Sequence, residues 1–135
     1  MPKRILPHNH GEDLELLLER IPETEGLSLA ADLFKEVSDS TRLRIFWLLC
    51  HCEECVINLS AVMDMSPPAV SHHLARLRAA GLIVSRREGK EVYYRAADTK
   101  AAQSLHRMVE DMVEIACPDL FTARGDAARK DAGTK

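Results

Sequence analysis

The chain has 135 residues, of which 46% are hydrophobic and only 4% aromatic, and its formal net charge is −3. This length and composition predict one mainly helical domain with a modest core of aliphatic side chains. No long apolar run precedes the first acidic helical segment, so we expect neither a secretory signal nor a membrane span, and we predict a cytoplasmic protein.

Helical periodicity organises the N-terminal part of the chain. Residues 1–11 contain two prolines and a glycine and are predicted to form a flexible arm. Apolar residues at helical spacing predict helices over 12–21 and 28–37, and the segment 22–26 is expected to separate them. The segment 40–52 is apolar on nearly every side, so we predict a helix at the buried centre of the fold.

A helix-turn-helix pattern follows. A short helix is predicted to end near Asp64, and a turn leads into a second helix that Ser66 caps and Gly81 ends. Apolar residues at i, i+4 and i+7 from Val70 give this second helix one buried face and leave the opposite face polar. Such a polar face can approach the base edges in a DNA major groove.

A basic β-hairpin is predicted directly after this helix. Two β-branched or aromatic runs flank residues 87–90, a turn that contains glycine. Residues 66–95 carry six basic and two acidic side chains, a local net charge of +4, whereas residues 1–65 carry a net charge of −6. Positive charge is therefore concentrated at the second helix and the hairpin, where it can contact phosphates. A basic hairpin in this place is a wing.

A long amphipathic helix, capped by Asp98, is predicted near the C-terminus. Its apolar stripe from Leu105 to Ala116 is longer than a small core requires, so we expect a dimer interface that pairs it with the first helix. The charged segment 123–135 is predicted to be disordered. The predicted fold is mainly α with a small β-hairpin wing, a winged helix-turn-helix domain over 12–122 that dimerises through its first and last helices.

Three segments and the final helix carry a family resemblance. The segments are DSTRLRIFWLL, EECVINL and MSPPAVSHHLARLRAAGLIVSRREGKEVYYR. They look like the ArsR/SmtB family of winged-helix repressors, and the resemblance covers roughly residues 29–117. It implies a homodimer on a double-stranded operator with an imperfect inverted repeat, which is released when an inducer binds, usually a metal ion or metalloid.

The resemblance also implies which residues contact DNA. Bases would be contacted by Ser71 and His72 of the second helix, and the groove or phosphates by its neighbours and the wing. The full predicted set is Ser66, Pro68, Ser71, His72, His73, Arg76, Arg86, Arg87 and Lys90. For the two histidines the alternative is a solvated helix face.

Three cysteines within six residues predict a sensing site. They form the pattern C-x-C-x-x-C at the end of a helix, where three thiols can converge on one ion, with His8 and His10 as further possible ligands. Soft thiolates favour As(III), Cd(II), Pb(II), Zn(II) or Cu(I). Cys55 fits a ligand position of the family, although Ile57 and Asn58 depart from the family's motif. The candidate metal ligands are Cys50, Cys52, Cys55 and Cys117.

Alternatives to this sensing site remain open. Cys50 continues an apolar stripe and can be a core residue, and Cys117 can mark only a helix end. Some relatives use one cysteine of the third helix and one of the last as a redox or persulfide switch, for which Cys50 and Cys117 are the candidates. The family's zinc site across the last helices is rejected, because its positions hold no histidine here. Those positions are Asp98, Lys100, Asp111 and Glu114.

Our leading prediction is a non-enzymatic transcriptional repressor that leaves its operator when a thiophilic ion binds the cysteines. A small thiol oxidoreductase is the alternative from another class, because Cys52 and Cys55 have the bare C-x-x-C spacing. No strand is predicted before this pair and no nucleotide-binding loop is present, which disfavours the enzyme.

Overall fold

The computed structural model describes residues 5–119. It divides into two compact units, Met1–Lys35 and Glu36–Lys135, which we describe separately. The described part of the predicted arm, residues 5–11, contains no helix or strand. The predicted tail at 123–135 lies outside the described residues. Between residues 5 and 119, none of the helices combines the length and the apolar character that crossing a membrane requires.

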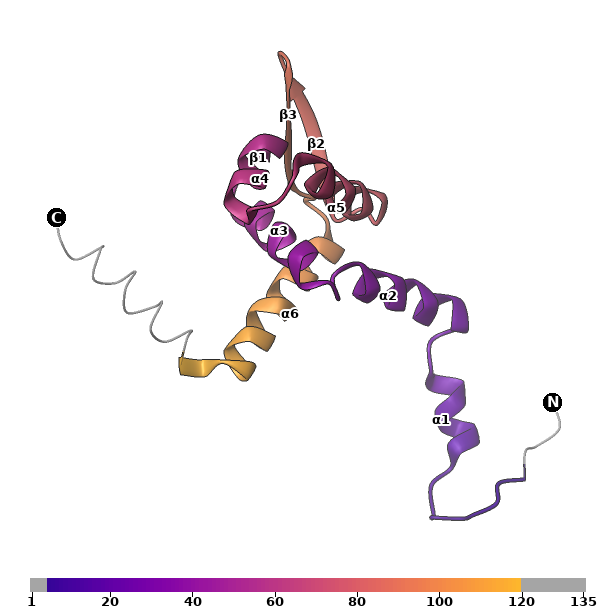
Figure 1. Ribbon diagram of the computed structural model, residues 1–135. Helices are drawn as coiled ribbons and strands as arrows, with labels where there is room; N and C mark the ends of the chain where they lie inside the picture. Colours follow the sequence, from indigo (N-terminus) through magenta and orange to yellow (C-terminus); the bar gives the residue numbers. More distant parts are fainter. Residues whose placement is uncertain (1–4, 120–135) are drawn as a thin grey trace. The chain divides into compact units, whose positions relative to one another are not determined.

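The first unit consists of helix α1 (Leu14–Arg20) and most of helix α2 (Thr24–Glu36), drawn in indigo to violet in Figure 1. The Asp13 carboxylate caps α1. Helix α2 begins four residues earlier than predicted, because Gly26 does not interrupt it. A glycine within a helix lowers stability by only about 1 kcal/mol relative to alanine. Neither helix contains a buried residue, and most of the apolar side chains predicted to face inward are exposed, whereas Leu33 is half-buried and Val37, just after α2, is buried.

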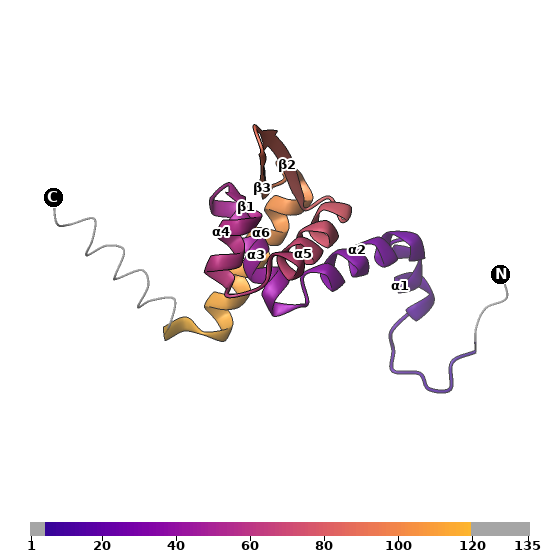
Figure 2. The ribbon, with the colours of Figure 1, turned by 45° about the horizontal axis from the view of Figure 1, so that its top comes forward.

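The second unit is a winged helix-turn-helix fold, as predicted. Its three-stranded antiparallel sheet has the order β1-β3-β2, and the β2–β3 hairpin extends away from the helices (Figures 1 and 2). In chain order the elements are α3 (Ser40–His51), β1 (Glu54–Cys55), α4 (Val56–Met63), α5 (Pro67–Ala79), β2 (Ile83–Glu88), β3 (Glu91–Ala96) and α6 (Lys100–Ala116).

The core of this unit lies where α3 packs against α5 and the sheet. Each fully buried aliphatic or aromatic side chain contributes roughly 1.5–3 kcal/mol to stability. The predicted inner face of α5 is buried, with Val70, Leu74 and Leu77 at most 1% exposed. The core also includes Ile45, Phe46, Leu49, Leu59, Met63, Leu82, Ile83, Ala102 and Leu105. Helix α3 is not buried on all sides, however, since Trp47 is 38% exposed.

Local backbone signals set the boundaries of α5 and the wing. The Ser66 hydroxyl accepts a hydrogen bond from the Ala69 N–H at 3.3 Å, which confirms the predicted N-cap. Gly81, just after α5, has a φ of +75°, and Gly89 in the hairpin turn has a φ of +61°. Both values lie in the left-handed region that glycine enters without steric cost.

Two local features differ from the sequence analysis. Strand β1 was not predicted; it is two residues long, and it pairs Cys55 with Tyr93 of β3. The N-cap of α6 is Thr99 rather than Asp98, because the Thr99 hydroxyl accepts the Ala102 N–H while the Asp98 carboxylate accepts the side-chain amide of Gln103. Adjacent residues that both favour caps are difficult to separate from sequence alone.

Candidate functional site

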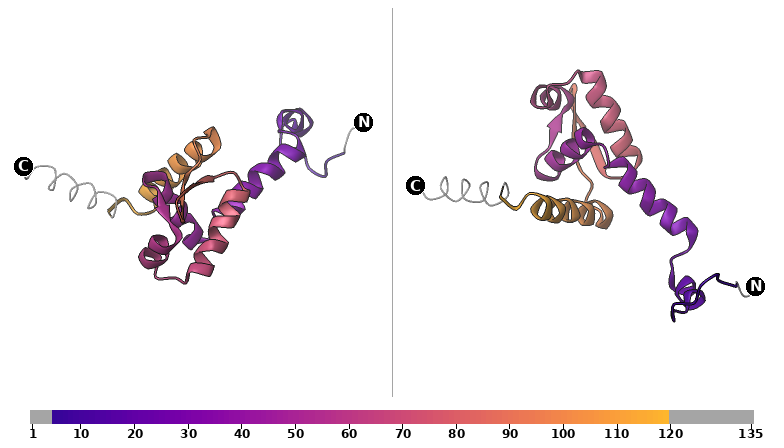
Figure 3. Two further views of the ribbon diagram at one scale, coloured as in Figure 1. Left: turned by 90° about the horizontal axis from the view of Figure 1, so that it is seen from above. Right: turned by 60° about the horizontal axis from the view of Figure 1, so that its bottom comes forward.

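The exposed face of α5 is polar and lacks acidic side chains. Ser71 and His72 are exposed, and so is Pro68 in the first turn. No Asp or Glu occurs anywhere in the helix, and its last turn carries Arg76 and Arg78. In both views of Figure 3 the turn between α4 and α5 lies on the side of the unit opposite α6. The helix can therefore approach another molecule without obstruction from α6.

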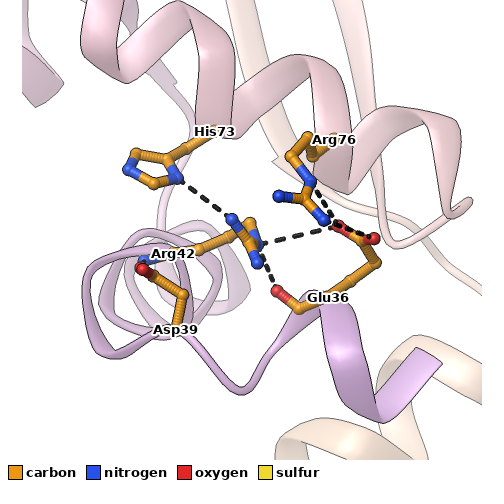
Figure 4. A network of polar contacts seen from close by, with 5 residues as sticks. All are labelled: Glu36, Asp39, Arg42, His73 and Arg76. Carbon is orange, nitrogen blue, oxygen red and sulfur yellow. Dashed lines mark hydrogen bonds and ion pairs between the residues drawn. The ribbon is translucent and has the colours of Figure 1, made fainter. Parts of the chain in front are cut away.

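Two of the predicted DNA contacts, His73 and Arg76, take part in a polar network inside the unit (Figure 4). The Arg76 guanidinium forms a two-point ion pair with the Glu36 carboxylate, with Nε–Oε2 and Nη2–Oε1 distances of 3.1 Å. Arg42, only 5% exposed, donates from Nε to the Glu36 carbonyl oxygen and approaches the His73 Nδ1 at 3.3 Å. The network fixes α5 against α3 and Glu36 within the second unit.

His73 is held in its neutral form within this network. A guanidinium only donates hydrogen bonds, so the His73 Nδ1 that faces Arg42 must be the unprotonated nitrogen. Burial lowers the pKa of His73 below its ordinary value of 6.5; the nearby Arg42 charge acts in the same direction, and Asp39 opposes it. Protonation of His73 is therefore unfavourable in the folded protein.

We expect stability to fall as the pH drops below about 6.5, because the unfolded chain then binds a proton on His73 that the folded chain resists. The difference between the urea midpoints at about pH 7 and about pH 5 should be smaller for His73→Gln than for the wild type. His72→Gln, a matched change one residue away, should keep the wild-type difference. Equal pH dependence in His73→Gln and the wild type would contradict this assignment.

The wing arginines also divide into two groups. The Arg86 guanidinium contacts the Glu53 carboxylate, with Nη2–Oε1 at 2.5 Å, and the Glu88 carboxylate at 2.7 Å. The hydrogen bond from Arg86 lowers the pKa of Glu53. Arg87 and Lys90 are exposed. Two carboxylates therefore compensate the charge of Arg86, whereas the side chains of Arg87 and Lys90 face solvent.

The four cysteines lie in different environments and are all free thiols. Cys50 is half-buried, and burial, aided by the Glu110 carboxylate, raises its pKa from 9.0 to about 11. Cys52 is exposed, and its thiol donates a hydrogen bond to the Leu48 carbonyl oxygen at 3.2 Å. Partial burial of the sulfur and, to a smaller extent, the Glu54 carboxylate raise the pKa of Cys52. Cys55 is buried on β1, and Cys117 is exposed at the end of α6.

Another set of side chains that can bind a metal ion does converge. The ligand atoms of His51, His106 and Glu110 all lie within 4.8 Å of one another. Within residues 5–119 this is the one such group of three or more His, Cys, Asp or Glu side chains. The predicted cysteine ligands are thus not assembled at one point in this structure. The spacing of His106 and Glu110, one helical turn apart, is visible in the sequence, but His51 is 55 residues from His106, so no local pattern joins them.

Two helices joined by a tight turn, with a basic hairpin behind the second, define a winged helix-turn-helix protein, a class whose members bind DNA. The family model of bacterial regulatory proteins of the arsR family matches residues 39–85.

Two relatives with similar sequences are both repressors. The transcriptional repressor SmtB homolog of Synechocystis sp. is 34% identical over 114 residues, which is 84% of this chain and 86% of the relative. The arsenical resistance operon repressor of Escherichia coli is 47% identical over 68 residues, 50% of this chain and 58% of that repressor.

A solved structure is also similar to this chain. The homodimeric winged helix-turn-helix DNA-binding domain of a possible ArsR-family regulator from Mycobacterium bovis has a TM-score of 0.61 and 27% identity, and the match covers 70% of this chain and 88% of that chain. The chain belongs to the ArsR family of bacterial transcriptional regulators, which are DNA-binding proteins rather than enzymes.

Proposed function

We propose that the protein is a cytoplasmic transcriptional repressor that binds operator DNA as a homodimer and leaves it when a metal or metalloid ion binds. The observation that carries this proposal is the exposed, acid-free face of α5 beside the exposed wing cations Arg87 and Lys90. Ser71 and His72 face outward in the half of α5 that would enter the major groove. The wing cations contact backbone phosphates or the minor groove.

The dimer follows from the apolar side of α6. Met108, Met112 and Val113 are between 42% and 55% exposed in the single chain, which is unusual for three large apolar side chains on one helix stripe. The stripe fits a second copy of the chain, with α1 as its partner element. A two-fold dimer presents two α5 helices to successive major grooves, about 34 Å apart.

Release requires an inducer, for which we propose a thiophilic ion at Cys52 and Cys55 with Cys50 or Cys117 as third ligand. The segment between α3 and α4 has to rearrange for these thiols to meet, because Cys55 is buried on β1. Since β1 pairs with wing strand β3, that rearrangement would alter the wing. The raised pKa of Cys50 weighs against this thiol both as a redox partner and as a metal ligand, because the thiolate is the reactive and the metal-binding form, so Cys117 is the favoured third ligand.

The test is fluorescence anisotropy on an operator fragment from the protein's own promoter. As(III), Cd(II), Pb(II), Zn(II) and Cu(I) are each titrated into the complex of the wild type and of Cys52→Ser, Cys55→Ser and Cys117→Ser. We expect at least one thiophilic ion to weaken binding by about tenfold or more, within the usual range of allosteric coupling. Cys52→Ser should stay bound. An operator affinity unchanged by every ion at stoichiometric concentration would contradict the proposed induction.

A further inference from the structure

We propose that His51, His106 and Glu110 form a second metal site, for a borderline divalent cation such as Zn(II), within one subunit. The three side chains come from the end of α3 and the middle of α6. None of them is among the cysteine ligands proposed above. The site is also distinct in position from the rejected set of carboxylate and lysine positions on the last helix.

The distances between the ligand atoms suit a tetrahedral ion. His51 Nε2 lies 3.1 Å from His106 Nε2 and 3.5 Å from Glu110 Oε1, and His106 Nε2 lies 2.9 Å from the same oxygen. Zinc bonds of about 2.0–2.2 Å place tetrahedral ligand atoms about 3.3–3.6 Å apart. The His51–Glu110 pair already lies in this range, and the other two pairs have to separate by only about 0.2–0.7 Å to admit the ion.

The donor set determines which ions the site takes. Two imidazole nitrogens and one carboxylate oxygen suit Zn(II), Co(II) or Ni(II) and offer nothing to a thiophilic ion such as As(III). Three protein ligands leave a fourth position for water or another group. The side chains of His51, His106 and Glu110 are 46%, 27% and 33% exposed, so an ion can enter from solvent.

Trp47 positions two of the three ligands. Its indole Nε1–H donates to Glu110 Oε1 at 3.3 Å, and its ring lies 4.3 Å from the His51 ring, centroid to centroid. Outer contacts of this kind hold metal ligands in a fixed orientation. They also explain why an aromatic side chain stays partly exposed on α3.

The site joins two elements with different tasks. Helix α3 leads through β1 into the helix-turn-helix, and α6 carries the exposed apolar stripe of the proposed dimer. A bound ion would fix the position of α6 relative to α3 and with it the spacing of the two α5 helices. This regulatory consequence rests on the proposed function, whereas the binding of the ion does not.

Cobalt(II) titration of the full-length protein tests the binding directly. We expect about one ion per chain with the intense visible absorption of tetrahedral cobalt and without sulfur-to-cobalt charge-transfer bands, and we expect zinc to displace it. His106→Gln and Glu110→Gln should each weaken cobalt affinity about tenfold or more. Glu114→Gln, on the same helix one turn further along, is the matched control and should bind as the wild type does.

Three outcomes would overturn the site: wild-type cobalt affinity in His106→Gln and His51→Gln, charge-transfer bands that disappear in Cys52→Ser, or absence of cobalt binding. Circular dichroism of each variant confirms that it is folded. Operator anisotropy with and without Zn(II) is measured on the same samples. Failure of the metal-free protein to bind the operator would contradict the proposed function. The cobalt titration would still test the metal site independently.

Discussion

Arg42→Ala should lower the free energy of unfolding by about 3 kcal/mol, the largest effect we expect from a substitution outside the apolar core. Arg42 is buried, and its guanidinium contacts the Glu36 main-chain oxygen, the Glu36 carboxylate at 3.7 Å and the His73 ring. Its removal leaves a partly buried carbonyl with one donor fewer and a cavity between α3 and α5. Breaking a buried ion pair costs about 3–5 kcal/mol, and the lower figure applies because Arg76 still pairs with Glu36.

Urea unfolding followed by circular dichroism at one fixed protein concentration measures this change. Arg44→Ala is the matched control, because Arg44 is an exposed arginine of the same helix and should change stability by no more than about 0.5 kcal/mol. Equal urea midpoints for the two variants would show that the network in Figure 4 does not hold α5 in place.

The elements that carry local signals could be predicted. Ser66, the apolar positions of α5 and the glycine in the hairpin turn each act within a few residues of their own position, and the structure confirms them. Strand β1 could not be predicted, since its two residues exist as a strand only because β3 lies beside them. This strand has a functional consequence, because the predicted metal ligand Cys55 is buried on it.

The candidate site shows the same division between features set by local sequence and features that depend on tertiary contacts. Sequence position predicts that His73, Arg76 and Arg86 lie close to DNA, but it does not reveal the partners that engage them. Glu36 lies 40 residues before Arg76, and Glu53 lies 33 residues before Arg86, so these contacts depend on tertiary structure. The same reason hides the His51 ligand of the proposed metal site, since only the fold brings α3 to α6.

His72→Ala should weaken operator binding about tenfold or more, because a side chain that contacts a base edge contributes about 1–3 kcal/mol to discrimination. Its affinity for DNA of unrelated sequence should stay the same, since phosphate contacts are unaffected. Lys90→Ala should behave differently, with a similar loss on both DNAs and a salt dependence of log K shallower by about one. The two variants therefore separate base contacts by α5 from backbone contacts by the wing.

Fluorescence anisotropy on the operator and on a scrambled fragment, each over a range of salt concentrations, measures both effects. Lys100→Ala is the matched control for Lys90→Ala, because Lys100 is an exposed lysine at the start of α6, outside the α5 face and the wing. If His72→Ala lost affinity equally on both fragments, His72 would be a phosphate contact, and the register of α5 in the groove would have to shift. A wild-type salt dependence in Lys90→Ala would remove the wing tip from the interface and leave Arg87 and the ion-paired Arg86 as the wing's predicted contacts.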